Sequence, residues 1–148
     1  MKISLADRND ISDLCALLDA LFSQESEFAP NRNSQIKGLT DIIENPSIGS
    51  IVVAREDDQV IGMVNLLYTV STALGGRVVL LEDMVVDPKL RDKGVGSALL
   101  EYGIEIARQK DCLRISLLTD ADNVGAHRFY EKHGFDRSSM TVFRKLLV

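Results

Sequence analysis

Cysteine is scarce in this chain of 148 residues, which contains only Cys15 and Cys112. The two lie far apart and form no C-x-x-C pair, so the sequence predicts neither a zinc site nor a disulfide framework, and we expect both as packing residues. Long apolar runs are also absent, because no stretch approaches the roughly 18 residues of a membrane span. A cytoplasmic protein without a membrane segment or a bound metal is therefore expected.

Clusters of basic residues are missing as well. The chain has 17 Lys and Arg against 22 Asp and Glu, a formal net charge of −5, and lacks the basic patch of a nucleic-acid-binding protein. An acidic balance suits a cationic partner. No repeat, low-complexity tract or linker divides the sequence, and 45% of its residues are hydrophobic, enough for a core. One domain over residues 1–148 is expected.

Hydrophobic periodicity predicts strands and helices in alternation. The first helix follows Asn9 and Asp10, two candidate N-caps. The near-continuous apolar run 113–118 is typical of a strand buried on both sheet faces. The order βααβββαβαββ predicts an α/β domain with a mixed sheet covered on both faces. The expected strands are 2–5, 48–54, 60–69, 78–86, 113–118, 135–137 and 141–147, and the expected helices are 11–22, 34–45, 94–109 and 123–133.

A glycine-containing turn after the strand 78–86 is the first candidate site. Gly94 and Gly96 place several backbone N–H groups at a predicted helix N-terminus, beside Arg91 and Lys93. Such a terminus attracts anions, and glycine lets the backbone approach a pyrophosphate closely. The alternative is a helix start that contains glycine and binds nothing.

Two other phosphate-binding motifs fit this turn less well. The P-loop pattern G-x-x-x-x-G-K-[ST] has no match. The dinucleotide fingerprint is closer, since Gly94-Val95-Gly96 follows a strand and precedes a helix. However, Leu99 stands where a third small residue belongs, and the long segment 87–93 separates the strand from the first glycine. A nicotinamide-binding domain is therefore a disfavoured alternative.

The segment Arg91-Asp92-Lys93-Gly94-Val95-Gly96 resembles the coenzyme motif Gln/Arg-x-x-Gly-x-Gly/Ala of the GCN5-related N-acetyltransferase (GNAT) family. The run Leu81-Glu82-Asp83-Met84-Val85-Val86 before it, and Asn123-x-x-Ala126-x-x-Phe129-Tyr130-x-x-x-Gly134-Phe135 after it, occur in the family's order. The resemblance implies an α/β (α+β) fold of the GNAT type, with a mixed central sheet of about seven strands and helices on both faces. It also implies transfer of acetyl from acetyl-CoA to an amine.

The resemblance further implies how acetyl-CoA is held. The pantetheine arm runs beside the end of the strand 78–86 as an added strand would, and the pyrophosphate lies on the turn. Asn123 hydrogen-bonds the coenzyme. Asp92 stands where many relatives have glycine, and we expect its carboxylate to face solvent while Lys93 offsets its charge. The coenzyme-binding residues implied are Met84, Val85, Val86, Arg91, Asp92, Lys93, Gly94, Val95, Gly96, Ser97, Asn123, Ala126 and Tyr130.

Two carboxylates interrupt the apolar strand 78–86. Glu82 and Asp83 would be costly there without partners, and strand alternation is expected to send them to opposite faces. By resemblance to family members such as the polyamine acetyltransferases, Glu82 takes the amine proton, often through water. The alternative for Glu82 is a structural ion pair, and Asp83 is expected to anchor loop backbone or an arginine. Either carboxylate can also bind a cationic acceptor.

Tyr130 corresponds to the family's tyrosine beside the coenzyme sulfur, where it hydrogen-bonds or protonates the leaving thiolate. With reference pKa values near 10 for tyrosine and 8.5 for a thiol, full proton transfer costs about 2 kcal/mol, so hydrogen bonding is the expected role. The alternative is packing beside Phe129. No G-x-S-x-G elbow or catalytic-cysteine signature offers a covalent nucleophile, so direct attack by the amine is expected. The oxyanion is expected to meet a backbone N–H of residues 84–86.

The resemblance places the acceptor between the first two helices and the loop after the third strand, here residues 22–33 and 69–77. Glu25 and Glu27 in this region can attract a polycation or an aminoglycoside-like amine, although a solvated helix end is the favoured explanation. Phe22, Phe28 and Tyr68 either line an apolar wall of the acceptor site or belong to the core. A small amine is the expected acceptor; a peptide or protein amine, or a non-catalytic acyl-CoA-binding module, are the alternatives. Apolar residues 141–148 favour a homodimer. The candidate substrate-binding residues are Phe22, Glu25, Phe28, Glu82 and Asp83.

Overall fold

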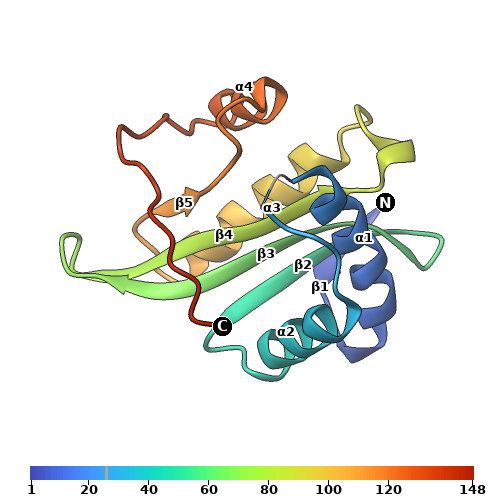
Figure 1. Ribbon diagram of the computed structural model, residues 1–148. Helices are drawn as coiled ribbons and strands as arrows, with labels where there is room; N and C mark the ends of the chain where they lie inside the picture. The colour runs from blue at the N-terminus through green and yellow to red at the C-terminus, as the bar shows by residue number, and fades with distance from the viewer. Residues whose placement is uncertain (26) are drawn as a thin grey trace. The chain divides into compact units, whose positions relative to one another are not determined.

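The computed structural model describes residues 1–25 and 27–148 and divides them into two units, Met1–Leu118 and Thr119–Val148. The first unit contains the β-sheet with helices α1, α2 and α3, and the second contains helix α4 (Figure 1). None of the helices formed by residues 1–25 and 27–148 could span a membrane.

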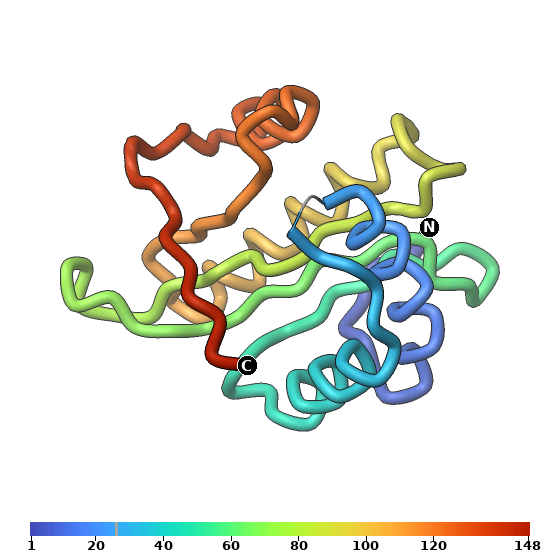
Figure 2. The backbone as a smooth tube through the Cα atoms, in the orientation of Figure 1, coloured from blue at the N-terminus to red at the C-terminus, as the bar shows by residue number. Residues whose placement is uncertain are grey.

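The sheet of the first unit is mixed and has five strands in the order β1-β2-β3-β4-β5. Strands β1 to β4 pair antiparallel, and β5 pairs parallel to β4. The long hairpin of β3 and β4 can be followed in Figure 2. The strand bounds are Lys2–Leu5 for β1, Gly49–Glu56 for β2, Gln59–Ser71 for β3, Gly76–Val86 for β4 and Ile115–Leu117 for β5.

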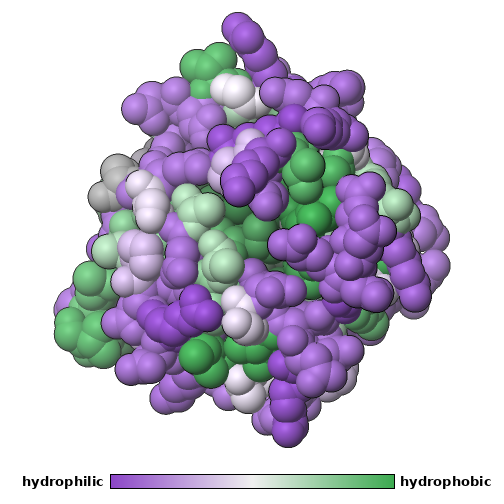
Figure 3. Space-filling model, turned by 90° about the vertical axis from the view of Figure 1, so that its right-hand side faces the viewer, coloured by the Kyte–Doolittle hydropathy of each residue, from purple (hydrophilic) through white to green (hydrophobic). Residues whose placement is uncertain are grey.

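Helices cover both faces of this sheet, as predicted. Helices α1 (Ile11–Gln24) and α2 (Arg32–Glu44) share one core with β2, β3 and β4, in which Leu14 and Met63 are fully buried. Helix α3 (Val95–Gln109) packs on the other face. There a Cβ on Gly62 would lie 2.8 Å from Leu99 Cδ1, so the glycine lets helix and strand approach. Figure 3 shows one side of the molecule, where hydrophilic side chains surround an apolar centre.

Of the two candidate N-caps predicted for α1, Asp10 does occupy the N-cap position, and Asn9 does not. Asp7, which was not predicted, accepts a hydrogen bond from the Asn9 N–H at 2.8 Å and caps a short 3-10 turn, Arg8–Asp10, that leads into α1. Asp10 occupies the N-cap position of α1 but makes no side-chain cap bond. Its buried carboxylate instead receives two hydrogen bonds of 2.6 Å from Arg55 and one of 2.8 Å from the Asp7 N–H.

The expected strand count of about seven is wrong. In the second unit α4 (Val124–Lys132) forms where a helix was predicted, but residues 135–137 and 141–147 form no strand. An apolar run becomes a strand only where a neighbouring strand completes its hydrogen bonds, and no ladder in the described part of the chain includes these residues. The predicted strand 113–118 shortens to β5, an edge strand whose Ile115 and Leu117 are only half-buried.

The two cysteines match the expectation of packing residues. Cys15, on the buried face of α1, is fully buried in the core, Cys112 is half-buried after α3, and both thiols are free. Burial raises the pKa of both thiols, which keeps them protonated and unreactive near neutral pH. No cluster of His, Cys, Asp and Glu suited to a metal ion occurs in the residues that the structure describes.

Candidate functional site

The second half of β4 has an open edge. The parallel ladder with β5 pairs only Val79, Leu80 and Leu81 of β4, while the antiparallel ladder with β3 continues to Val86. From Glu82 to Val86, β4 therefore has β3 on one side and no strand of the described residues on the other. Unpaired backbone groups of this kind can bind an extended ligand as an additional strand.

The direction of these backbone groups follows from one hydrogen bond. The Asp87 N–H donates to the Ile61 carbonyl on β3 at 2.8 Å. Because successive N–H groups of a strand point to opposite sides, those of Met84 and Val86 are directed toward the open edge. They can serve a pantetheine amide or the oxygen of a polarised thioester.

A β-bulge brings the two predicted carboxylates to one side of the sheet. Asn65 of β3 pairs with Asp83, and the next residue of β3, Leu66, pairs with Leu81, so Glu82 is an extra residue in β4. Glu82 and Asp83 both line one cavity. The prediction that they lie on opposite faces is wrong, because the bulge interrupts the alternation on which it depended.

This cavity lies on the sheet face covered by α1 and α2 and has a volume of about 320 Å³. Its wall is mainly apolar, and its only ionisable groups within the described residues are the two carboxylates. Volumes of roughly 300–1,000 Å³ are usual for small-molecule sites. The residues that line it are Leu18, Phe22, Ser34, Gln35, Gly38, Leu39, Ile42, Asn65, Leu67, Glu82 and Asp83.

The two carboxylates differ in their surroundings. Glu82 is exposed, whereas Asp83 is half-buried and accepts a hydrogen bond of 2.9 Å from Asn65 Nδ2. Burial raises the pKa of Asp83 to about 6, while the Asn65 hydrogen bond acts in the opposite direction and the neighbouring Glu82 adds a smaller rise. Asp83 was expected to bind loop backbone or an arginine. Its hydrogen-bond partner among the described residues is instead Asn65.

The glycine turn between β4 and α3 has the backbone that an anion site needs. Gly94 has φ +82° and caps α3, whose first intrahelical bond is from the Ala98 N–H to the Gly94 carbonyl at 3.1 Å. The N–H groups ahead of that bond have no intrahelical acceptor. Asp92 has φ +64° and is exposed. Glycine is favoured at such an angle and aspartate tolerates it, which explains how the chain can depart here from the family pattern.

Two further predicted residues belong to the second unit. Asn123 is the N-cap of α4, where its Oδ1 accepts a hydrogen bond from the Ala126 N–H at 3.1 Å. Tyr130 lies on the same helix in edge contact with Phe129 and Phe135, and burial raises its pKa to about 12. His127 on this helix is half-buried, and its Nε2 lies 3.0 Å from the Asp120 carbonyl oxygen. Within this unit, Asn123 thus has a structural role and Tyr130 retains its proton at neutral pH.

The expected acceptor residues are only partly brought together. Phe22 lines the cavity with Glu82 and Asp83, but Glu25 and Phe28 do not, and Phe28 instead packs on the Phe22 ring at 6.0 Å between centroids. The expected wall 22–33 includes Ser26, which lies outside the described residues. The loop 69–77 is absent from the lining of the cavity.

Sequence reasoning missed Asn65, which is buried beside Asp83. The available signal was a carboxamide within the otherwise apolar run 60–67 of β3. Tyr68, treated as an acceptor wall or as core, belongs to neither. Its hydroxyl contacts Ser50 at 2.5 Å and its ring lies beside Arg77 and Lys110.

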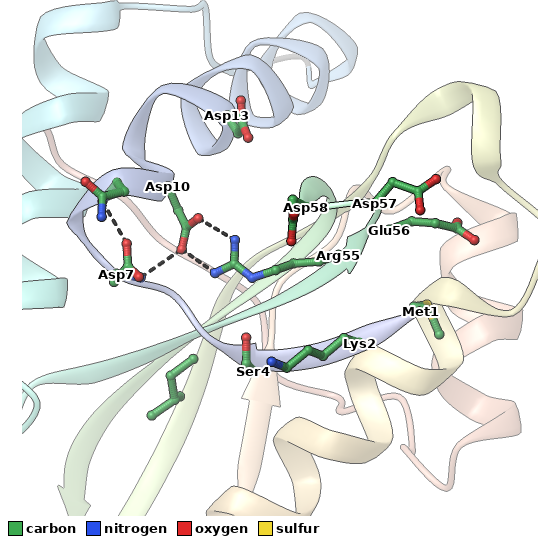
Figure 4. A pocket seen from close by; sticks show the side chains of 12 residues that line it. Met1, Lys2, Ser4, Asp7, Asp10, Asp13, Arg55, Glu56, Asp57 and Asp58 are labelled. Atoms are coloured by element: carbon green, nitrogen blue, oxygen red, sulfur yellow. Dashed lines mark hydrogen bonds and ion pairs between the residues drawn. The ribbon is translucent and has the colours of Figure 1, made fainter.

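A second hollow lies away from the bulge, beside β1 and the β2–β3 turn (Figure 4). It has a volume of about 840 Å³ and contains the Asp10–Arg55 ion pair. The Arg55 hydrogen bonds lower the pKa of Asp10, so this carboxylate remains ionised and paired with Arg55. The other labelled acidic side chains are Asp7, Asp13, Glu56, Asp57 and Asp58. The arrangement is that of a structural ion pair on an acidic surface.

Comparison with known proteins agrees with the geometry. The sequence model of the Acetyltransferase (GNAT) family matches residues 12–135. The chain is 28% identical to the glucosamine 6-phosphate N-acetyltransferase of Trypanosoma brucei brucei, over 91% of this chain and 88% of that protein. It is 27% identical to the aminoalkylphosphonate N-acetyltransferase of Salmonella typhimurium, over 95% of this chain and 88% of the relative.

A solved structure shows the same fold. A possible acetyltransferase from Clostridium difficile 630 superimposes with a TM-score of 0.88 at 18% identity, covering 99% of this chain and 97% of that one. The bulge, the open strand edge and the glycine-capped helix thus occur on a fold shared with an acetyltransferase-like structure, and the family match spans all three. The chain belongs to the GNAT acetyltransferase family.

Proposed function

We propose that this acetyltransferase passes acetyl from acetyl-CoA to the primary amine of a small molecule by direct attack. The observation that carries the proposal is the open edge of β4 beside the bulge, whose carboxylates line a cavity of small-molecule size. The edge provides a place for the pantetheine arm, and the Gly94 turn provides N–H groups for the pyrophosphate. The two named relatives, which by name acetylate small amines, support a small acceptor.

In this mechanism the amine nitrogen attacks the thioester carbonyl, the C–N bond forms and the C–S bond breaks. Glu82 takes the amine proton through water, which its exposure permits. A backbone N–H of the Met84–Val86 segment meets the developing oxyanion. The remaining electron pair leaves on the coenzyme sulfur.

Tyr130 is assigned to the departing thiolate by resemblance to the family. Its pKa of about 12 makes it a hydrogen-bond donor and not a proton source, because transfer to a thiolate with a pKa near 8.5 would cost about 5 kcal/mol. Hydrogen bonding alone stabilises the leaving group, and solvent supplies the proton afterwards. The coenzyme can therefore leave as a thiolate that is stabilised by a hydrogen bond from the Tyr130 hydroxyl, without proton transfer from Tyr130.

The test is release of free thiol when the purified protein is incubated with acetyl-CoA and a panel of amines that includes both relatives' named substrate types. Glu82→Gln is expected to lower kcat by roughly 10²–10⁴-fold, as for loss of a general base. Tyr130→Phe is expected to lower kcat as well, through loss of the hydrogen bond. Matched controls are Glu56→Gln and Tyr102→Phe, which change an exposed residue outside the cavity and are expected to leave kcat unchanged.

Two outcomes would overturn the proposal. Calorimetric binding of acetyl-CoA without thiol release for any amine would make the chain a non-catalytic acyl-CoA-binding module. Binding of NADH without binding of CoA would make it a nicotinamide-binding domain. If only peptide amines were acetylated, the protein would still be an acetyltransferase, but its acceptor would be a peptide or protein and not a small molecule.

A further inference from the structure

Among the described residues that line the cavity beside the bulge, one buried side-chain atom has no hydrogen-bond partner. Asn65 is 3% exposed, and its Oδ1 is buried and accepts no hydrogen bond. Its Nδ2 donates to Asp83 Oδ2 at 2.9 Å, and because an ionised carboxylate only accepts, this bond fixes which end of the amide is the oxygen. A buried carbonyl oxygen of this kind is costly unless a donor reaches it.

The other polar groups that line the cavity do not supply that donor, and the exposed Ser34 hydroxyl makes no hydrogen bond to it. Gln35 is already satisfied, since its Nε2 donates to Asp19 at 2.9 Å and its Oε1 accepts from the Asn31 N–H at 2.8 Å. Glu82 and Asp83 are acceptors when ionised. The inner wall of the cavity therefore contains the Asp83 carboxylate, with the Asn65 oxygen buried beside it just behind the surface. Together they suit a group with several donors and a positive charge, which reaches the oxygen once the Asn65 side chain rotates slightly.

The charge and size of the cavity further limit which ligands can bind in it. None of its described lining residues is Lys, Arg or His, so nothing there can pair with a phosphate or phosphonate. Two carboxylates would repel such an anion. The apolar part of the wall comes from side chains such as Leu18, Phe22 and Leu39. At about 30 Å³ per small heavy-atom group, 320 Å³ admits a molecule of about ten such groups.

We propose that the acceptor is a compact primary amine with an apolar body, an inference that rests on the proposed function. Its ammonium group donates to Asn65 Oδ1 and to the Asp83 carboxylate. The same cavity excludes amines that carry a phosphate or phosphonate. Asn65 and Asp83 determine specificity. Glu82, at the exposed position of the bulge, accepts through water the proton that the ammonium group must release before its nitrogen attacks the thioester.

Kinetics with matched amines test this proposal. The probe is 2-phenylethylamine, compared with glucosamine 6-phosphate and 2-aminoethylphosphonate in the thiol-release assay. We expect kcat/KM for the probe to exceed that of both anionic amines by at least about a hundredfold, as for an unpaired buried charge. Asn65→Leu is expected to raise KM for the probe roughly ten- to hundredfold with little change in kcat, because it removes a hydrogen bond to a charged group.

The control is Thr69→Ala, an exposed position farther along β3 that does not line the cavity, and it is expected to change neither constant. Where Asn65→Leu fails to fold, Asp83→Asn provides the same comparison, with the expected rise in KM. If kcat/KM for either anionic amine equalled that of the probe, the inference about the acceptor would be wrong, while the proposed acetyltransferase activity would remain supported.

Binding without catalysis separates the inference from the proposed function. Calorimetry with the protein alone should show 2-phenylethylamine bound and 2-phenylethanol, which lacks the ammonium group, bound at least about tenfold more weakly. This result holds even if no amine releases thiol, in which case only the proposed function fails. Equal binding of the amine and the alcohol, or no binding of the amine, would overturn the inference.

Discussion

The ionised side chain of Asp83 lowers the free energy of unfolding of this protein. Its half-buried carboxylate has one described hydrogen-bond donor, Asn65, and burial raises its pKa from 3.8 to about 6. An acid whose pKa is raised on folding stabilises the folded state fully below its unfolded pKa, and that contribution is lost as the pH rises through the folded value. Between pH 4 and pH 6 the charge of Asp83 therefore becomes a cost to the protein.

This cost predicts that Asp83→Asn stabilises the protein at neutral and higher pH. The asparagine has nearly the same shape and carries no charge, so the expected gain in the free energy of unfolding is about 2 kcal/mol at pH 8. At pH 5 the wild-type carboxyl is largely protonated, and the gain should be smaller. Urea unfolding of both proteins at the two pH values measures the difference.

Asp58→Asn is the matched control, because this exposed carboxylate lies in the β2–β3 turn away from the cavity. It should change stability little at either pH. A wild-type protein more stable than Asp83→Asn at pH 8 would mean that the carboxylate has a stabilising partner in the folded state, contrary to its raised pKa.

At the same scale, the sequence located the carboxylates of the site but not their geometry. Glu82 and Asp83 were visible as charges within an apolar strand, and alternation then assigned them to opposite faces. The bulge that unites them depends on the pairing of Asn65 with Asp83 and of Leu66 with Leu81. Register between two strands is a property of the pair, so the pattern of one strand cannot reveal it.

At the scale of elements, the start of α3 concentrates the conformational demands of the coenzyme site. Gly94 has φ +82°, an angle that costs a residue with a side chain about 1–2 kcal/mol. Gly94→Ala should therefore lower the free energy of unfolding by about 1 kcal/mol and weaken acetyl-CoA binding, because relief of the strain turns N–H groups away from the pyrophosphate. Chemical unfolding and calorimetry measure the two effects.

Gly38→Ala is the natural control for this substitution. Gly38 lies within α2, has no positive φ, and a Cβ there would meet nothing within 4 Å. Alanine should stabilise the helix by about 0.5–1 kcal/mol and leave coenzyme binding unchanged. Equal loss of stability in both variants would show that the Gly94 angle carries no special strain.

Elements with a strong local pattern were predictable, and those defined by distant partners were not. The apolar spacing of α1 and α3 located both helices to within a few residues, because one buried face leaves its period in the sequence. The apolar stretch 141–147 looked equally like a strand but forms none, since a strand requires a partner that its own residues do not encode. Asp10 stands at the predicted N-cap position of α1, but its side chain pairs with Arg55, 45 positions away, and makes no hydrogen bond to the start of the helix.

At the scale of the whole molecule, the C-terminal residues present apolar surface to solvent. Phe143 and Leu147 are 95% and 89% exposed, within a segment 140–148 that forms no strand. Large apolar side chains exposed next to one another mark association surfaces in soluble proteins. Because this segment belongs to no ladder of the sheet, it can pair with a strand edge of another copy.

These features predict a homodimer in solution. The chain has a mass of 16.4 kDa, so light scattering at micromolar concentration should give twice that value, about 33 kDa. The double variant Phe143→Asp with Leu147→Asp should be monomeric, because two charges in the apolar segment oppose burial. Leu74→Asp, an exposed apolar position in the β3–β4 turn, serves as the control and should remain dimeric. A wild-type mass of 16.4 kDa would contradict the dimer and leave the terminal segment as surface of a monomer.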